Sequence, residues 1–199
     1  MNKLLTLLLT AAVPGACIAQ ALQTAPVTDT LNWQDKLSYH AKKTYDPLAI
    51  AGFAAYAGVL QAMDTPEEWG QGGGAYGKRV ASTAAWSGIH GTLAFGLDTA
   101  LHQDPRYHRS LDTGFWRRAG HAVRGTVLTR TDAGGETLST WRIGSAYGGA
   151  FLSNMWYPDR LNTPRLGFLQ GSLTLGFDLV GNLGSEFWPD IKRNVLRRK

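Results

Sequence analysis

Apolar residues recur every three or four positions along much of this chain, which is the spacing of one face of an α-helix. Trp33, Leu37 and then Ala41 or Tyr45 follow this spacing. The pattern predicts a short amphipathic helix that ends near Tyr45. With the largely polar residues before it, this helix makes up a first segment, residues 22–45, that begins as a flexible lead.

Four proline-containing stretches indicate where further helices begin or end. Asp46-Pro47 places an N-cap acid before a proline at the first helical position, and Thr163-Pro164 has the same form. Thr65-Pro66-Glu67-Glu68 adds Glu68 at the capping-box position. Trp188-Pro189-Asp190 is expected to break the chain before its last turns. Because proline suits the first turn of a helix and disrupts a strand, an all-α fold is predicted.

Two segments also carry a competing strand signal. In residues 89–97 and 173–179 apolar and other residues alternate, as they do in the strands of an outer-membrane β-barrel. In the first segment, however, Ile89, Leu93 and Leu97 also satisfy the helical spacing. The proline signals favour the helical bundle, and the barrel is the alternative.

The chain repeats parts of itself in the same order. Residues 51–64 match residues 119–132, and the tripeptide Ala-Tyr-Gly recurs at 75–77 and 146–148. The second copy carries an insertion, residues 157–165, which is expected to split its second long helix. An internally duplicated bundle follows, with two similar helical hairpins about a pseudo-twofold axis.

The predicted organisation is a leader, a lead segment and one helical domain. The domain covers residues 46–199, with repeats at about 46–112 and 113–191 and a basic C-terminal tail. Small residues occupy every fourth position in the first repeat, and the second repeat partly matches them: Ala84, Gly88, Thr92, Gly96 and Ala100, then Gly144 and Gly148, then Ser172 and Gly176. Such spacing predicts helices that approach one another closely.

The N-terminus has the pattern of a secretory signal over residues 1–21. Lys3 precedes an apolar run, Leu4–Val13, and Ala19-Gln20-Ala21 offers a cleavage site. Lipidation at Cys17, the only cysteine, is the alternative, although Pro14 stands where that motif needs a bulky aliphatic residue. Cleavage after residue 21 leaves no thiol, which excludes disulfides and cysteine catalysis. We expect an exported protein of the periplasm or outer membrane.

The charge distribution favours a membrane surface or another envelope component as partner. Removing the leader takes away one lysine and lowers the formal charge from +5 to +4. The C-terminal cluster of Lys192, Arg193, Arg197, Arg198 and Lys199 suits contact with anionic lipid. Nucleic acid is a poor partner for an exported chain. Uncharged stretches at 47–63 and 80–97 are short for crossing a bilayer, so docking is favoured over spanning.

A few histidines and acids are the candidates for chemistry. His90, Asp98 and His102 are predicted to share one helix face, which would make Asp98 and His102 an acid/base pair or two metal ligands. The repeat also matches Asp98 to Asp178 and Asp64 to Asp132, so Asp132 is a further candidate. The alternative, which we favour, is structural: a buried aspartate that pairs with an arginine or caps a helix. No third ligand stands at motif spacing, so no metal or cofactor is predicted.

Three arginines are candidates for binding anions. Arg106 and Arg109 lie in a polar stretch after the first repeat's long helix, and Arg130 precedes Asp132 and two glycines. The alternative for residues 129–135 is a helix C-terminus with a glycine stop, which that residue order favours.

No recognised catalytic motif is present: the chain lacks HExxH, GxSxG, a P-loop and a GxGxxG that follows a strand. The blocks EWGQGGGAYGKRVAS, DPRYHRS, LTRTDAGG, MWYP and SEFWPDIKR resemble a family of exported bacterial proteins. The resemblance runs from about Trp33 to the C-terminus. It implies a compact exported domain, and it carries over no catalytic residue because that family has no assigned activity.

The sequence thus favours a structural or interaction protein of the cell envelope that acts at or near a membrane surface. The alternative is an envelope enzyme, or a lipid- or anion-binding protein, with His90, Asp98, His102 and Arg130 in a cleft between the repeats.

Overall fold

The structure is a computed structural model that describes residues 30–196 of the chain. The predicted leader, Cys17 and the last three residues of the basic tail lie outside this range. The described part is all-α apart from one short hairpin, which confirms the predicted fold class. Its helices are α1 (Trp33–Tyr45), α2 (Pro47–Ala62), α3 (Gly73–Ala100), α4 (Phe115–Val127), α5 (Thr140–Asn154) and α6 (Pro164–Leu196). A 3-10 turn covers Glu67–Trp69, and the antiparallel strands β1 (Leu128–Arg130) and β2 (Glu136–Leu138) pair with Thr129 opposite Thr137.

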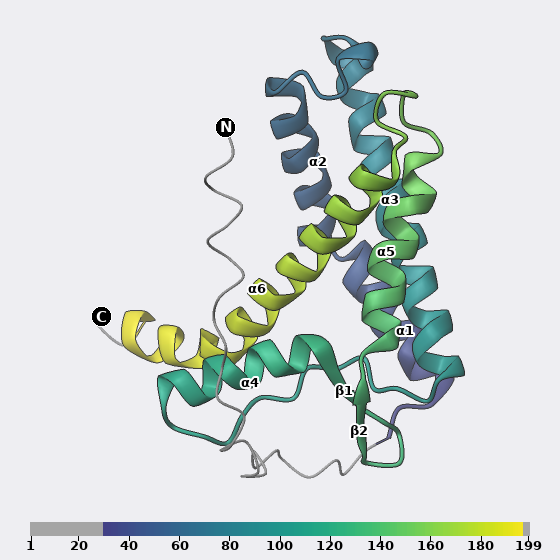
Figure 1. The fold of residues 1–199 in the computed structure, drawn as a ribbon. Helices are drawn as coiled ribbons and strands as arrows, with labels where there is room; N and C mark the ends of the chain where they lie inside the picture. Colours follow the sequence, from purple (N-terminus) through teal and green to yellow (C-terminus); the bar gives the residue numbers. More distant parts are fainter. Residues whose placement is uncertain (1–29, 197–199) are drawn as a thin grey trace, which may run out of the picture.

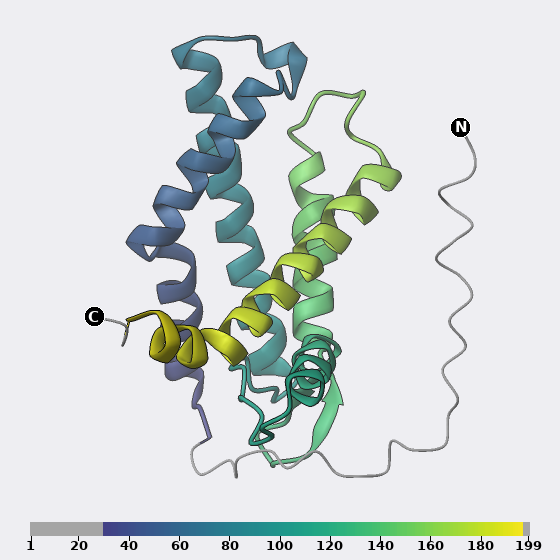
Figure 2. The same ribbon diagram turned by 90° about the vertical axis from the view of Figure 1, so that its left-hand side faces the viewer.

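Helices α3 and α5 pack side by side and form the centre of the domain (Figure 1). α2 and α1 pack on α3, while α6 packs on α5 and crosses it diagonally; α4 lies under the lower part of α6. Figure 2 shows α2 and α6 on the same face of the domain, in front of α3 and α5. A groove lies between α2 and α6, and its lining also includes residues of α3 and the end of α5.

Local capping explains where two helices begin. The Asp46 carboxylate accepts a hydrogen bond from the Leu48 amide at 2.6 Å, and Pro47 is the first helical residue. Thr163 caps α6 in the same way, because its hydroxyl accepts from the Leu166 amide at 3.2 Å. Both predicted starts are confirmed.

The other two proline predictions are wrong. Glu67 and Glu68 lie in the 3-10 turn, which has no side-chain cap, and α3 begins only at Gly73. α6 continues through Pro189 to Leu196 and changes direction near its end (Figure 1). Arg118 of α4 donates to the Glu186 carbonyl in the turn before Pro189. A proline inside a helix removes one backbone hydrogen bond and bends the helix, and here the helix continues beyond it.

The two segments with alternating apolar residues, 89–97 and 173–179, lie in α3 and α6. Close helix contact occurs at only some of the predicted small residues. A Cβ atom on Gly144 would lie 2.8 Å from Leu97, and one on Gly148 would lie 3.1 Å from Leu93, so α5 packs tightly on α3. Gly96 and Gly176 face open space, however, and the close approach of α6 to α5 uses Gly167 and Gly171 in their place.

The matched segments of the two repeats take different structures. Residues 51–62 lie in α2, whereas their counterparts run from α4 into β1. The inserted residues 157–165 span the connection between α5 and α6 and the first turn of α6, so two separate helices stand in the second half. The pseudo-twofold arrangement stays a prediction.

The interior contains small and polar side chains, while large apolar side chains lie outside. Buried apolar residues are six alanines and Trp141, and the largest fully buried side chains include Arg79, Lys36, Glu186 and Asp98. Helix α1 shows this clearly. Its polar residues Lys36, His40 and Thr44 are buried, whereas Trp33, Leu37 and Tyr45 are exposed. The predicted helix and its end at Tyr45 are confirmed, and it is the polar face of this helix that points inward.

Candidate functional site

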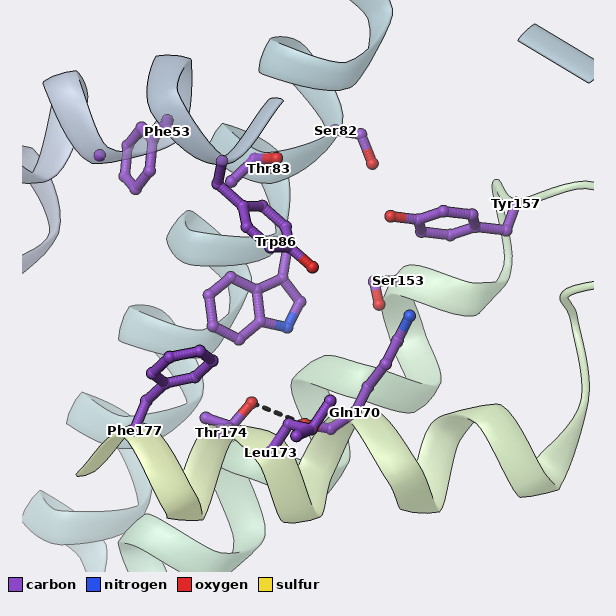
Figure 3. A pocket seen from close by; sticks show the side chains of 12 residues that line it. Phe53, Ser82, Thr83, Trp86, Ser153, Tyr157, Gln170, Leu173, Thr174 and Phe177 are labelled. Atoms are coloured by element: carbon purple, nitrogen blue, oxygen red, sulfur yellow. Dashed lines mark hydrogen bonds between the residues drawn. The ribbon is translucent and has the colours of Figure 1, made fainter. Parts of the chain in front are cut away.

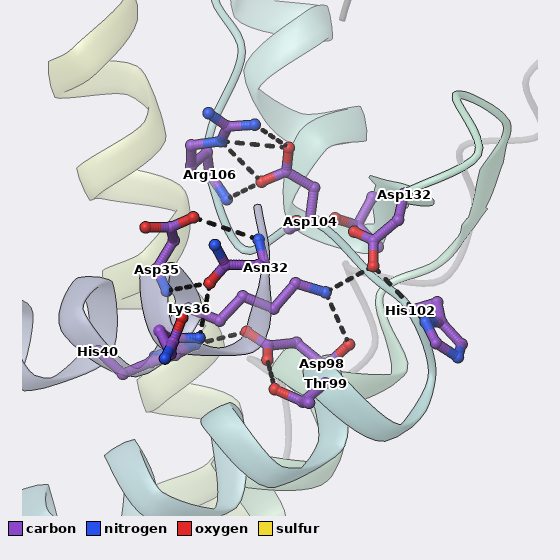
Figure 4. A network of polar contacts seen from close by, with 12 residues as sticks. Asn32, Asp35, Lys36, His40, Asp98, Thr99, His102, Asp104, Arg106 and Asp132 are labelled. Atoms are coloured by element: carbon purple, nitrogen blue, oxygen red, sulfur yellow. Dashed lines mark hydrogen bonds and ion pairs between the residues drawn. The ribbon is translucent and has the colours of Figure 1, made fainter. Parts of the chain in front are cut away.

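A network of charged side chains joins α1, the end of α3 and the hairpin (Figure 4). The Lys36 ammonium donates to the Asp132 carboxylate at 2.8 Å and to the Asp98 carbonyl at 3.3 Å. His40 Nε2 lies 2.5 Å from the Asp98 carboxylate, and the Thr99 hydroxyl donates to that carboxylate at 3.2 Å. Asp98 has no exposed surface. The network is internally paired and lies away from solvent, which is the structural arrangement that a buried ion pair requires.

The predicted pairing of Asp98 with His102 is wrong. α3 ends at Ala100, and His102 follows with a φ of 51°, so it leaves the helix face on which Asp98 lies. Its side chain is 82% exposed and lies 3.7 Å from Asp132. Asp178, which the repeat matches to Asp98, lies 3.8 Å from the Arg142 guanidinium. The expected aspartate–arginine pair is therefore present in the second half, whereas Asp98 in the first half pairs with His40.

His90 lies between α3 and α5, apart from Asp98 and His102. Its ring stacks on Trp86, and its Nε2 lies 3.3 Å from the Ser145 hydroxyl. Burial lowers the pKa of His90 to about 4, because the positive charges of Lys43 and His40 add to desolvation while only Asp178 opposes them. His90 is therefore a neutral packing residue near pH 7.

Arg106 and Arg130 lie at one small polar cavity of about 40 Å³, together with His108 and His121. Arg106 is bound to Asp104 at 2.8 Å. Burial alone would raise the pKa of Asp104. Hydrogen bonds from His108 and Arg106 outweigh burial and hold this pKa far below its usual range.

Arg109 is exposed and does not line this cavity. Residues 129–135 form strand β1 and the hairpin turn, with Gly134 at a φ of 90°, so the predicted helix C-terminus is wrong. This segment is not helical because α4 already ends at Val127, and the residues that follow it pair as strand β1 with residues 136–138.

Sequence reasoning missed a buried cluster around Glu186. The Tyr107 hydroxyl and Arg118 Nε donate to its carboxylate at 2.8 and 3.0 Å, and the Tyr107 hydroxyl also lies 3.1 Å from His121 Nδ1. Burial and the bond to Glu186 raise the pKa of Tyr107 above its usual value. The cluster fixes α4 and the loop before it to α6. Its members stand about 70 to 80 residues apart in the sequence, so no local pattern indicates them.

A larger cavity of about 260 Å³ lies in the groove between α2 and α6 (Figure 3). Its walls come from α2 and α6, and its floor comes from α3 and the end of α5. The lining residues are Gly52, Phe53, Tyr56, Ser82, Thr83, Trp86, Ser153, Tyr157, Gln170, Leu173, Thr174 and Phe177. None of them carries a formal charge at neutral pH.

The lining is divided between aromatic and polar ends. In Figure 3, Phe53, Trp86 and Phe177 lie on one side, while Ser153, Tyr157 and Gln170 lie on the other. The absence of charge in residues 47–63 is the one sequence signal that bears on this groove. The groove itself depends on the crossing of α6 over α5, which the sequence does not show.

Within residues 30–196, no group of three or more His, Cys, Asp or Glu side chains is placed to hold a metal ion. Among the helices of that range, none combines the length and apolar character needed to cross a membrane. Comparison of the chain with known protein families, curated protein sequences and solved structures gives no match in any of the three.

Proposed function

We propose that this protein is a cell-envelope component that docks on a membrane surface through the face formed by α2 and α6, with a structural or interaction role. The observation that carries the proposal is the placement of large apolar side chains on the outside and of small and polar ones inside. In lipid, helices associate through small and polar residues while large apolar side chains face the acyl chains. The same distribution is unfavourable in water.

Helix α2 presents this feature most strongly. It contains no charged residue from Pro47 to Ala62, and Ala57 is its only buried residue. Leu48 is 81% exposed, and Ile50 and Val59 are about half exposed. Burial of each such side chain in an apolar phase is worth about 2 kcal/mol, so a few of them suffice to attach the domain to a bilayer interface.

On α6, Leu169, Leu173, Phe177 and Val180 are exposed, and Leu173 and Phe177 also line the cavity toward α2. Cations stand near the ends of these two helices. Lys42 and Lys43 precede α2 and are exposed, although Lys43 also lies 3.7 Å from Asp178, and Lys192 is exposed in the last turns of α6. Each cation close to an anionic membrane contributes roughly 1 kcal/mol. The two features together fit an interfacial docking surface for anionic lipid.

A vesicle co-sedimentation assay tests the proposal. The chain without residues 1–21 should bind vesicles that contain anionic lipid and should resist release by high salt, because apolar contacts survive screening. The double variant Leu48→Glu/Val180→Glu should bind far more weakly. The control is Leu138→Glu, which adds one charge at an exposed apolar position on the hairpin. Equal binding by the double variant and the control, or no binding by the parent chain, would reject membrane docking.

The alternative of an enzyme with a polar site between the repeats lacks support from the geometry. His90 packs inside the α3–α5 interface, Asp98 is enclosed by α1, and His102 is on the surface. Arg130 lies at the small polar cavity with other residues. These four side chains do not line a common cleft.

A further inference from the structure

We infer that the groove cavity between α2 and α6 binds one acyl chain of a membrane lipid, with the ester end of the chain at the polar side of the cavity. This inference rests on the proposed membrane docking, because residues of both helices of the docking face line the cavity.

The size of the cavity fits a single alkyl segment. A volume of about 260 Å³ corresponds to roughly nine water-sized units of ~30 Å³, and a methylene group has a similar size. A cavity lined mainly by apolar groups holds water poorly, so an apolar occupant is favoured over water there.

The chemistry of the lining selects an uncharged ligand. Phe53, Trp86 and Phe177 supply aromatic surface on one side. Tyr157 and Gln170 supply uncharged donors on the other side, which suit the carbonyl oxygen of an ester. A free carboxylate would need a cation, and the lining contains none. The nearby Arg160 is bound to Glu67 and Glu68 in the adjoining loops.

The position of the groove gives a lipid chain a direct path. Leu173 and Phe177 of α6 line the cavity and are also more than half exposed, so the cavity borders the docking face and a lipid chain would reach it there. A second copy of the protein would have to bury the same two helices and would exclude the bilayer from them. Occupancy of the groove by a second copy should therefore rise with protein concentration, whereas occupancy by a lipid chain should not.

Fluorescence quenching at Trp86 tests the inference on the leaderless chain. Vesicles of lipids brominated along the acyl chain should quench the parent protein more than the Trp86→Phe variant, and the difference reports bromine at the cavity. The variant Gly52→Phe should remove this difference, because Gly52 lines the cavity and has open space at its Cβ position. Gly58→Phe is the matched control, since Gly58 is on the same helix, also has open space and is outside the lining.

The outcomes separate the acyl-chain site from membrane docking. Retention of vesicle binding by Gly52→Phe, with loss of Trp86 quenching, supports the inference. Vesicle binding without any quenching at Trp86, or with equal quenching in both glycine variants, overturns it and leaves docking intact.

If the parent chain does not bind vesicles, a dispersed brominated monoacylglycerol tests the cavity alone. Its failure to quench Trp86 would also reject the acyl-chain site. Protection of Trp86 that appears only as the chain dimerises, measured by sedimentation, would assign the groove to a second copy and overturn the inference.

Discussion

Asp98 offers the sharpest test of whether the buried network is structural. Its carboxylate has no exposed surface and is bound by His40 at 2.5 Å. The substitution Asp98→Ala leaves His40 enclosed without this partner. Loss of one member of a buried pair costs about 3–5 kcal/mol. For a domain of this length each kcal/mol lowers the melting temperature by roughly 2–4 °C, so a fall of about 6–20 °C is expected.

The assay is urea unfolding followed by circular dichroism, with a double-mutant cycle for the pair. The double variant His40→Ala/Asp98→Ala should be less destabilised than the sum of the single variants, because the second change removes the group left unpaired by the first. Asp159→Ala is the control, since Asp159 is exposed, and it should change stability by less than about 0.5 kcal/mol. An Asp98→Ala protein with the parent midpoint would refute the structural role.

Three further changes test other parts of the fold. The pKa of His90 is about 4 in the native state and about 6.5 when unfolded, so the unfolded chain takes up a proton first as the pH falls. The free energy of unfolding should therefore fall by about 3 kcal/mol from pH 6.5 to 4. In a pH series of urea titrations, His90→Phe should flatten this decrease. In thermal melts, Gly171→Ala should destabilise the protein by about 1–3 kcal/mol, because the new Cβ would lie 2.7 Å from Cε1 of Tyr147. Gly176→Ala is the contrasting variant: its Cβ faces open space, so it should stabilise the protein by up to about 1 kcal/mol. Arg79→Met should cost at least about 3 kcal/mol by urea unfolding, because three backbone carbonyls lose a fully buried charged donor.

The helical fold could be predicted because its main signals are local. Asp46-Pro47 and Thr163-Pro164 set helix starts through contacts within three residues, and the structure has both. Pro189 was misread because a proline inside a helix can bend the helix without ending it, and α6 continues to Leu196. A proline alone does not show which of the two occurs.

The candidate site was predicted only in part for the same reason. Asp98 and Asp132 were singled out as polar positions in the repeats, and in the structure their partners are His40 and Lys36 on α1. The apolar spacing that predicted this helix did not indicate that Lys36 and His40 are buried. Helical spacing identifies a face, but the direction in which that face points depends on what the neighbouring helices offer, and here they offer carboxylates.

Polar contacts, more than apolar burial, hold α2 in place. At its start Asp46 caps the helix, and at its end Gln61 accepts a hydrogen bond from the buried Arg79 at 2.6 Å. Between them the Tyr76 hydroxyl of α3 donates to the Ala54 carbonyl at 3.0 Å. Because these contacts position the helix through its ends and backbone, most of its apolar side chains are left for another partner. The inward polar groups and the outward apolar groups are thus two consequences of one arrangement, and the proposed docking would use the apolar groups of the α2–α6 face.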